Sequence, residues 1–256
     1  MKAQVIVLDL NGQRLSPCSL ARARQLLAQG RATLRSEDPF TIQLPYTVSL
    51  RPTSQDSIEH KPGEGKRLLL HICCAPCSTY SIKRLRELGF EVSGLWYNPN
   101  IHPFAEYERR RECMESYAEQ IALPMVWEPY EMPAYFRAVV GHEAFGERCA
   151  ICYRLRLERT AQMAHQHGFD AFSTTLLISP YQQQSLIRRI GEELANQYCV
   201  SFYFENLRRG WSERGHMARE HDMYQQRYCG CIYSEWEAAQ KSAKRLPKAV
   251  SLQSGQ

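Results

Sequence analysis

Seven of the ten cysteines lie in three short groups that are far apart in the sequence, and this feature most restricts how the chain can fold. The groups are Cys73, Cys74 and Cys77, then Cys149 and Cys152, then Cys229 and Cys231. The first group directly follows the apolar run 68–70, so its thiols stand at the end of an expected strand. A fold that brings all three groups together would indicate that the protein uses their sulfur atoms chemically.

The expected location of the protein in the cell favours metal or redox chemistry over structural disulfides. No apolar run approaches the roughly 20 residues that a membrane-spanning helix requires, and the N-terminus lacks a secretory signal pattern. We therefore expect a cytoplasmic protein without a membrane partner. Cytosolic thiols are kept reduced, so ten cysteines are better explained by metal binding or redox activity.

Apolar strand candidates alternate with helical patterns from residue 67 onward, at 68–73, 91–97, 124–128, 170–175 and 200–204. This alternation predicts an α/β fold, with a mostly parallel sheet covered by helices. Ser179 is the expected N-cap of a helix through Ile187 and Ile190. The first segment predicts a small α+β appendage, with strands at 4–10 and 41–44 and a helix at 19–29.

Charge and composition divide the chain into four parts. Residues 1–50 form a small basic module, 51–66 a polar linker rich in Pro, Gly and Ser, 67–235 the main domain, and 236–256 a basic tail. Residues 1–51 carry seven Lys/Arg against three Asp/Glu, which is +4 of the net charge of +5. The module is either an RNA-binding surface or a solvated basic face, with Cys18 packed inside it.

The number of grouped thiols exceeds what one metal site needs. We expect Ser78 to cap a helix beginning just after Cys77, which places thiols near the positive end of a helix dipole. Four thiolates are the usual complement of a 4Fe-4S cluster or a tetrahedral zinc, so the surplus indicates a second function. The pair Cys229 and Cys231 closes too small a ring for a relaxed disulfide. The isolated Cys113 and Cys199 are expected to be small buried hydrophobes.

The segment after the second main-domain strand contributes polar candidates. Tyr97, Asn98, Asn100 and His102 are expected at the same sheet edge as the first cysteines, where they could hydrogen-bond a polar ring or donate a proton. The arginines at 109–111 and at 154, 156 and 159 lie on helices with apolar opposite faces. Most of them are expected to be solvated, with some contacting phosphate.

Five sequence blocks together resemble the QueH-type epoxyqueuosine reductases over residues 67–235. The blocks are 69–77, 97–103, 148–158, 173–180 and 227–234. The resemblance implies a fold akin to nucleotide α-hydrolases and the reduction of epoxyqueuosine to queuosine at the wobble base of the tRNAs for Asn, Asp, His and Tyr, with an external electron donor. Segments at 10–18, 21–24, 30–32 and 39–42 resemble the small RRXRR or PLMP-type module.

The same resemblance implies roles for individual cysteines. Cys73, Cys74, Cys149 and Cys152 become ligands of a 4Fe-4S cluster, while Cys229 and Cys231 become a redox-active pair or ligands of an additional iron. Cys77 becomes a further ligand of that iron. The chain departs from the pattern at Tyr181, where relatives often have histidine. An unpaired anticodon base can be splayed out and stacked on an aromatic ring such as Tyr97.

Two other functions compete with a reductase. A PP-loop tRNA thiolase would share the fold class and substrate, but it needs Ser-Gly-Gly-x-Asp-Ser after the first strand, where this chain has cysteines. The other alternative is a non-enzymatic RNA-binding module stapled by zinc, held by Cys74 and Cys77 together with Cys149 and Cys152.

Overall fold

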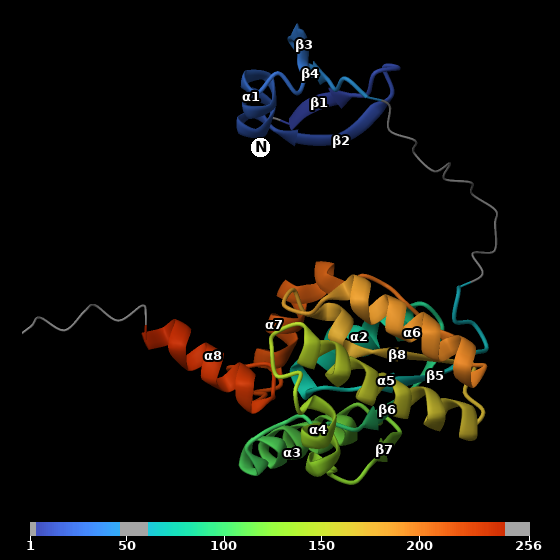
Figure 1. Ribbon diagram of the computed structural model, residues 1–256. Coiled ribbons are helices and arrows are strands. Elements are labelled where there is room, and N and C mark those ends of the chain that lie inside the picture. Colours follow the sequence, from blue (N-terminus) through green and yellow to red (C-terminus); the bar gives the residue numbers. More distant parts are fainter. Residues whose placement is uncertain (1–3, 47–60, 244–256) are drawn as a thin grey trace, which may run out of the picture. The chain divides into compact units, whose positions relative to one another are not determined.

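The computed structural model describes residues 4–46 and 61–243. The chain divides into two compact units between residues 59 and 60, and each is described by itself (Figure 1). Within the described residues, no helix is both long enough and apolar enough to span a membrane.

The smaller unit is a four-stranded sheet with one helix. Its elements are β1 Gln4–Leu8, β2 Arg14–Ser19, α1 Leu20–Ala28, β3 Thr33–Glu37 and β4 Phe40–Gln43. The strand order is β2-β1-β4-β3, and only β1 and β4 pair in parallel. The Ser19 hydroxyl accepts the backbone N–H of Arg22 and caps α1, which agrees with the predicted helix. The structure adds β2 and β3, which were not predicted.

The larger unit contains a five-stranded sheet in which every pairing is parallel. Its strands are β5 Arg67–His71, β6 Glu91–Trp96, β7 Met125–Trp127, β8 Ala171–Thr174 and β9 Ser201–Phe202. All five lie within the predicted strand segments except at the start of β5, which begins one residue earlier. Their order is β7-β6-β5-β8-β9. The predicted α/β class is confirmed.

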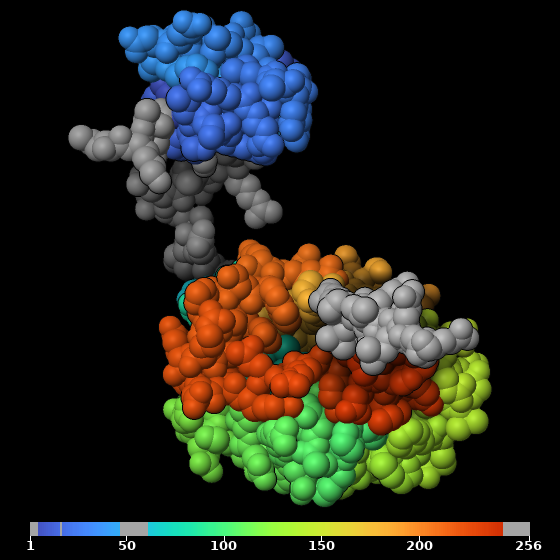
Figure 2. Space-filling model, turned by 90° about the vertical axis from the view of Figure 1, so that its left-hand side faces the viewer, coloured from blue at the N-terminus to red at the C-terminus, as the bar shows by residue number. Residues whose placement is uncertain are grey.

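Helices cover both faces of this sheet (Figure 1). They are α2 Ala75–Glu87, α3 Phe104–Gln120, α4 Met132–Val139, α5 Glu147–Gln166, α6 Gln184–Tyr198, α7 Trp211–Glu220 and α8 Ile232–Ala243, with the short 3-10 helices η1 Thr175–Ile178 and η2 Leu207–Gly210. Side chains of α5 and α6 pack on one face of the sheet, and those of α2, α3 and α7 pack on the other. In Figure 2, α7 and α8 appear in orange to red. The end of α7 meets α3, where the His221 and Tyr117 rings lie 5.2 Å apart.

The central strand β5 is apolar on both faces because each face is covered. Leu69 packs toward α5 and α6, whereas Leu68 and Leu70 pack toward α2 and α3, and all three are fully buried. Burying one such side chain contributes about 1.5–3 kcal/mol. The continuous Leu68–Leu70 run, which reads as an unbroken apolar segment in the sequence, therefore belongs at the middle of the parallel sheet.

The strand order reverses at β5. From β5 the chain adds β6 and β7 on one side, then crosses to place β8 and β9 on the other. In open parallel sheets, ligands bind beyond the carboxyl ends of the strands at this point of reversal. Residues that follow β5 and β8 therefore occupy the position where this architecture builds sites.

Two of the expected segments continue into the larger unit. Residues 61–66 of the expected linker form a turn packed on the domain, where the Gly63 N–H donates to the Leu88 carbonyl at 3.0 Å. Helix α8 crosses the expected boundary at residue 235. Residues 51–60 of the linker and 244–256 of the tail lie outside the described residues, and the finer domain boundaries stay predictions.

Two expectations about α6 are wrong. The helix begins at Gln184 with Gln183 as its cap, whereas Ser179 ends η1, because the chain makes a further turn after Pro180 before entering the helix. Cys199 is exposed, not a buried hydrophobe, because it ends α6 in the left-handed conformation with φ of 54°.

Replacement of the mid-helix glycines Gly191 and Gly215 by alanine should change the free energy of unfolding in opposite directions. A Cβ on Gly191 would lie 2.3 Å from the Phe202 ring, so Gly191→Ala should lower the free energy of unfolding by about 1–3 kcal/mol. A Cβ on Gly215 meets only the Arg219 guanidinium at 3.7 Å, so Gly215→Ala should raise it by up to about 1 kcal/mol. Urea unfolding of both variants checks the pair, and equal effects would contradict the packing of α6 on β9.

Candidate thiol site

The first cysteine group lies in the turn from β5 into α2. The strand ends at His71, and α2 begins at Ala75 with Cys74 as its N-cap and Pro76 in its first turn. The expected start after Cys77 is wrong, because proline at the start of a helix allows it to begin one turn earlier. Ser78 is not the cap, since its hydroxyl donates to the Ala75 carbonyl at 2.7 Å.

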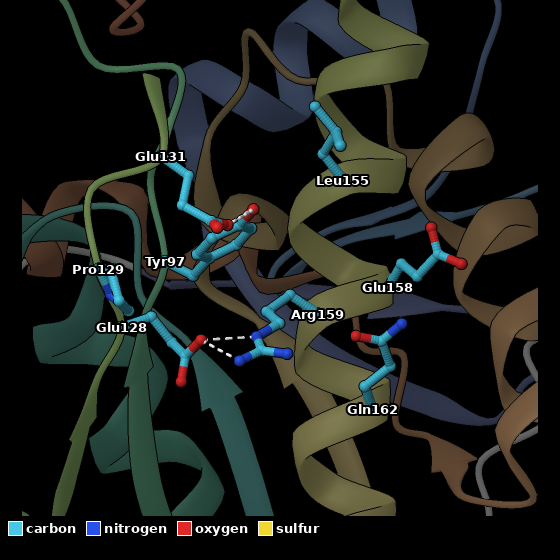
Figure 3. A pocket seen from close by; sticks show the side chains of 8 residues that line it. All are labelled: Tyr97, Glu128, Pro129, Glu131, Leu155, Glu158, Arg159 and Gln162. Atoms are coloured by element: carbon cyan, nitrogen blue, oxygen red, sulfur yellow. Dashed lines mark hydrogen bonds and ion pairs between the residues drawn. The ribbon is translucent and has the colours of Figure 1, made fainter. Parts of the chain in front are cut away.

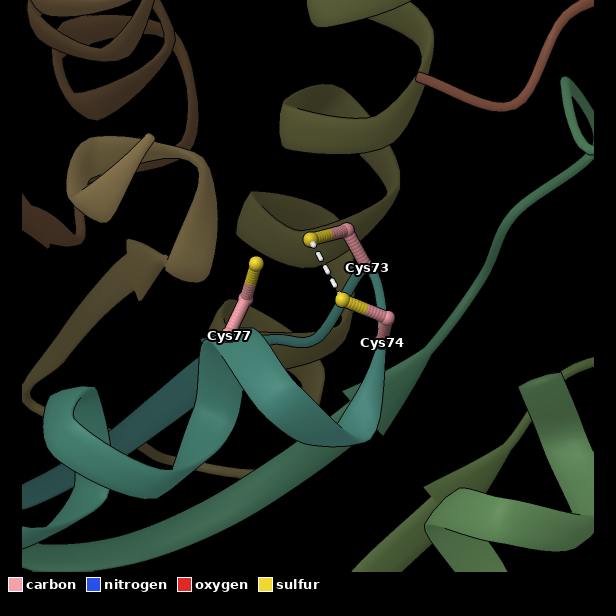
Figure 4. Close-up of side chains that lie close together, drawn as sticks. All are labelled: Cys73, Cys74 and Cys77. Atoms are coloured by element: carbon pink, nitrogen blue, oxygen red, sulfur yellow. Dashed lines mark hydrogen bonds between the residues drawn. The ribbon is translucent and has the colours of Figure 1, made fainter. Parts of the chain in front are cut away.

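The thiols of Cys73, Cys74 and Cys77 face one another (Figure 4). Their sulfur atoms all lie within 4.8 Å of one another, with 3.8 Å between Cys73 and Cys74. Neighbouring segments hold them in place. The Thr175 hydroxyl, directly after β8, accepts the Cys73 backbone N–H at 3.0 Å and contacts its sulfur at 3.2 Å. The Gln226 amide contacts the Cys74 sulfur at 3.0 Å.

The pKa values of these three thiols are shifted in different directions. Hydrogen bonds from Cys73 and Cys77 hold the pKa of Cys74 well below its usual range, and Arg110 adds to the effect. The bond with Cys74 raises the pKa of Cys73 to about 11, and bonds with both neighbours raise that of Cys77. Cys74, at the N-terminus of α2, is therefore the thiol of this group that most readily becomes a thiolate.

The second and third cysteine groups lie next to each other. Cys149 and Cys152 stand in the first turns of α5, and buried Cys152 packs in one cluster with Cys231 and Tyr135. Burial raises the pKa of Cys152 to about 12, although Arg156 opposes the shift. Although Cys229 is exposed, desolvation of its thiol raises the pKa, Arg156 and a hydrogen bond from Gln182 lower it, and the thiols of Cys231 and Cys73 raise it further. The Cys229 thiol thus interacts electrostatically with Cys73 of the first group and with Cys149 and Cys152 of the second.

A buried arginine fastens the Cys229 segment to the sheet edge. The Arg110 guanidinium pairs with Glu106 at 2.7 Å and donates to the carbonyls of Cys229 at 3.0 Å and Tyr228 at 3.1 Å. Gly230 lies so close that an added Cβ would meet the Asn100 amide at 3.1 Å. Arg110 is 2 % exposed, so the expectation of a solvated arginine is wrong here, because its partners come from a distant segment.

The polar candidates after β6 are buried and support the loop. The Asn98 amide donates to the Ile72 carbonyl at 2.8 Å, which ties this loop to the turn before Cys73. Asn100 and His102 are also buried, and the His102 backbone N–H donates to the Gly230 carbonyl at 2.8 Å. Burial lowers the pKa of His102 to about 4, so its ring is neutral near pH 7. The predicted substrate contacts of these residues stay predictions.

Tyr97 lines a cavity of about 310 Å³ (Figure 3). Its hydroxyl donates to Glu131 at 2.8 Å, and the wall opposite is formed by α5. Glu128 and Glu158 also line the cavity, against the single cation Arg159 among its lining residues. The excess of carboxylates makes the cavity unsuited to phosphate, and the predicted stacking of a base on Tyr97 stays a prediction.

Several site residues escaped sequence reasoning. They are Thr175, Gln226, Tyr135, Gln182 and Arg156, all of which contact or face a thiol. The Gln182 amide contacts the Cys229 sulfur at 3.4 Å. Only Arg156 could have been identified from the sequence. It follows Cys152 by four residues, and this spacing places two side chains on one face of a helix. It is 2 % exposed, so its expected solvation is wrong.

Comparison with known proteins places the larger unit in a family. Residues 68–237 match the family model described as epoxyqueuosine reductase QueH, and residues 5–69 match the one described as RRXRR protein. The chain is 43% identical over 172 residues to epoxyqueuosine reductase QueH of Dehalococcoides mccartyi, which covers 67% of this chain and 93% of the relative. It is 38% identical over 185 residues to that of Thermotoga maritima, covering 69% and 94%.

A solved structure described as a predicted subunit of tRNA methyltransferase from Methanocaldococcus jannaschii is also similar. It aligns with a TM-score of 0.42 and 15% identity, covering 60% of this chain and 75% of that chain.

Arg110 and its neighbour Arg111 give a matched test of the thiol loop. Each pairs with a glutamate four residues away, but the Arg110 pair is 2% and 8% exposed whereas the Arg111 pair is 41% and 41% exposed. Arg110→Met should cost about 3–5 kcal/mol of unfolding free energy, because it leaves buried Glu106 without its cation. It should also speed amide exchange at residues 228–231.

Arg111→Met should cost less than about 1 kcal/mol. Thermal unfolding and hydrogen exchange monitored by mass spectrometry check both variants. Unchanged exchange at residues 228–231 in Arg110→Met would contradict the anchoring role.

Proposed function

This chain belongs to the epoxyqueuosine reductase QueH family, and we propose that it reduces epoxyqueuosine to queuosine at the wobble position of tRNA, the last step of queuosine biosynthesis. The observation that carries the proposal is the gathering of Cys73, Cys74 and Cys77 within 4.8 Å at the point where the parallel strand order reverses. Cys229 interacts electrostatically with Cys73, and Cys231 packs with Cys152. The proposed substrates are the tRNAs for Asn, Asp, His and Tyr, which places the enzyme in the cytoplasm.

The reaction fixes what the site must supply. Conversion of an epoxide into an alkene breaks two carbon–oxygen bonds and releases the oxygen as water, which consumes two electrons and two protons. An external low-potential donor provides the electrons. The chain must bind the base, hold the thiols in place and deliver protons. The exposed Cys229 thiol, whose pKa is raised, is protonated near pH 7 when it holds no metal.

The residues fit an iron–sulfur group. Three thiols within 4.8 Å of one another, with Cys149 and Cys152 near Cys229, match the soft sulfur ligands that such groups require. On the resemblance to the family, we assign Cys73, Cys74, Cys149 and Cys152 to a 4Fe-4S cluster, although the structure groups Cys77 with Cys73 and Cys74. Such a cluster would supply electrons singly when bound.

The remaining site thiols form a second group in this proposal. Cys229 and Cys231 act as a redox-active pair or, with Cys77, hold an additional iron. Cys77 lies beside Cys73 and Cys74, so it adjoins the cluster ligands directly. This contact supports a short path for electrons between the two groups.

The rim of the thiol site is suited to unpaired RNA. Tyr181 is 79% exposed and makes an edge contact with Trp211 at 6.1 Å between ring centroids. The next residue, Gln182, contacts the Cys229 sulfur, so the exposed ring borders the thiols. A base can stack on such a ring. In the smaller unit, exposed arginines, among them Arg22 and Arg24, support phosphate contacts by the RRXRR-like module.

The decisive experiment uses tRNA that carries epoxyqueuosine. Anaerobically reconstituted full-length protein is incubated with this tRNA and a low-potential reductant, and the nucleosides are analysed by mass spectrometry. The expected product has lost one oxygen. A colourless preparation with stoichiometric zinc, no iron or sulfide, and no such product would instead support the zinc-stapled RNA-binding alternative.

Two cysteine variants separate the proposed roles. Cys229→Ala should abolish turnover but keep most of the cluster absorbance, because the cluster ligands remain. Cys149→Ala should lose both, because it removes a ligand. Visible absorbance, iron content and the mass-spectrometric assay measure the two variants side by side. Complete bleaching by Cys229→Ala would show that the thiols are divided differently.

A further inference from the structure

We propose that Arg156 is the fixed counter-charge of the thiol site: its buried guanidinium compensates the negative charge that the thiolates acquire when they hold metal. This inference rests on the proposed function only in taking the thiols as metal ligands. In this proposal Arg156 acts through the metal ligands and not on the substrate. The proposal replaces the expectation that this arginine is solvated or contacts RNA phosphate.

The guanidinium is enclosed by protein. Arg156 lies on α5 and is 2% exposed, and its Nε donates to the Cys152 carbonyl one turn earlier at 3.0 Å. Its Nη2 is buried and, among the residues that the structure describes, has no hydrogen-bond partner. Within those residues it also forms no ion pair with a carboxylate. An arginine cannot shed its proton, so the charge remains inside the protein.

The groups that face this charge are thiols. Burial acts to lower the pKa of Arg156, but Cys152, Cys229 and Cys73 outweigh it and the pKa is raised. These three come from α5, from the segment before α8 and from the turn after β5. The Tyr153 ring lies 5.9 Å away. His71 also faces it, and burial together with Arg156 lowers the pKa of that imidazole to about 3, so His71 adds no second positive charge.

Other buried arginines are compensated differently. Arg110 pairs with Glu106, and Arg148 pairs with Glu237. Arg214 stacks on the Trp211 ring at 4.2 Å and faces no thiol among its described contacts. Isolated buried charges are costly, so natural proteins pair them. Only thiolates remain to pair with Arg156 among its described neighbours, and metal binding is what turns buried thiols into thiolates.

The change in charge when metal binds gives the direction of the effect of Arg156 on metal affinity. With a divalent ion and three or more thiolates, the site is negative and the cation stabilises it. Removal of the charge should therefore weaken metal binding, and a substitution that keeps the charge should preserve it, a difference that a merely structural side chain does not produce.

The test compares Arg156→Met, Arg156→Lys and the control Arg214→Met in the full-length chain. Zn²⁺ alone is titrated into the metal-free protein against a competing chelator. Arg156→Met should lose about 10–100-fold in zinc affinity, as is typical when a group that supports metal ligands is removed. Arg156→Lys, which keeps the charge, should recover most of the affinity, and Arg214→Met should leave it unchanged.

A second readout fixes the interpretation. In iron-loaded Arg156→Met the midpoint potential should become more negative, because the reduced state carries more negative charge. If Arg156→Met does not fold, Arg156→Gln replaces it with the same expectations. A loss of affinity equal in the lysine and neutral variants, or no larger than in Arg214→Met, would overturn the proposal. Zinc affinity does not depend on turnover, so failure of the tRNA assay leaves this test decisive.

Discussion

The parallel pairing of β5 with both β6 and β8 is the constraint on which the thiol site depends. In this register His71 lies beside Thr174, so the next turn brings Cys73 onto the Thr175 hydroxyl. The β6 side contributes Asn98, whose amide holds the Ile72 carbonyl. Both neighbours of β5 thus fix the turn that carries the first thiols. A buried parallel sheet permits little slippage of register, so the pairing of its strands also fixes the positions of these sulfur atoms.

Charge balance is the second organising principle of the site. Sulfur, imidazole and guanidinium groups are enclosed together, yet His71 is kept neutral and the thiols share protons through hydrogen bonds. Arg110 is compensated by Glu106, whereas Arg156 faces sulfur. In a weakly polar interior each charge needs a partner close by. The protein thereby confines uncompensated charge to the place where metal chemistry is proposed, next to an exposed rim that is suited to a base.

The sequence anticipated the larger framework better than its local details. The five strands were predicted because their apolar runs are unbroken, and the end of β5 was correctly expected to carry the first thiols. The caps assigned to Ser78 and Ser179 were wrong, since serine is a weak signal where proline and a following turn decide the start of the helix. Strands β2 and β3 were missed because short strands depend on the partners against which they pair.

By itself, the sequence determined the order of strands and helices, the placement of thiols at strand and helix ends, and the resemblance that pointed to the family. These features depend on local patterns of residues. The tertiary structure decided that Cys77 stays with Cys73 and Cys74, and that Arg156 is buried where thiols of three segments act on its charge. Such contacts join segments far apart in the chain, so they are set by how the sheet closes and its helices pack, which no local pattern specifies.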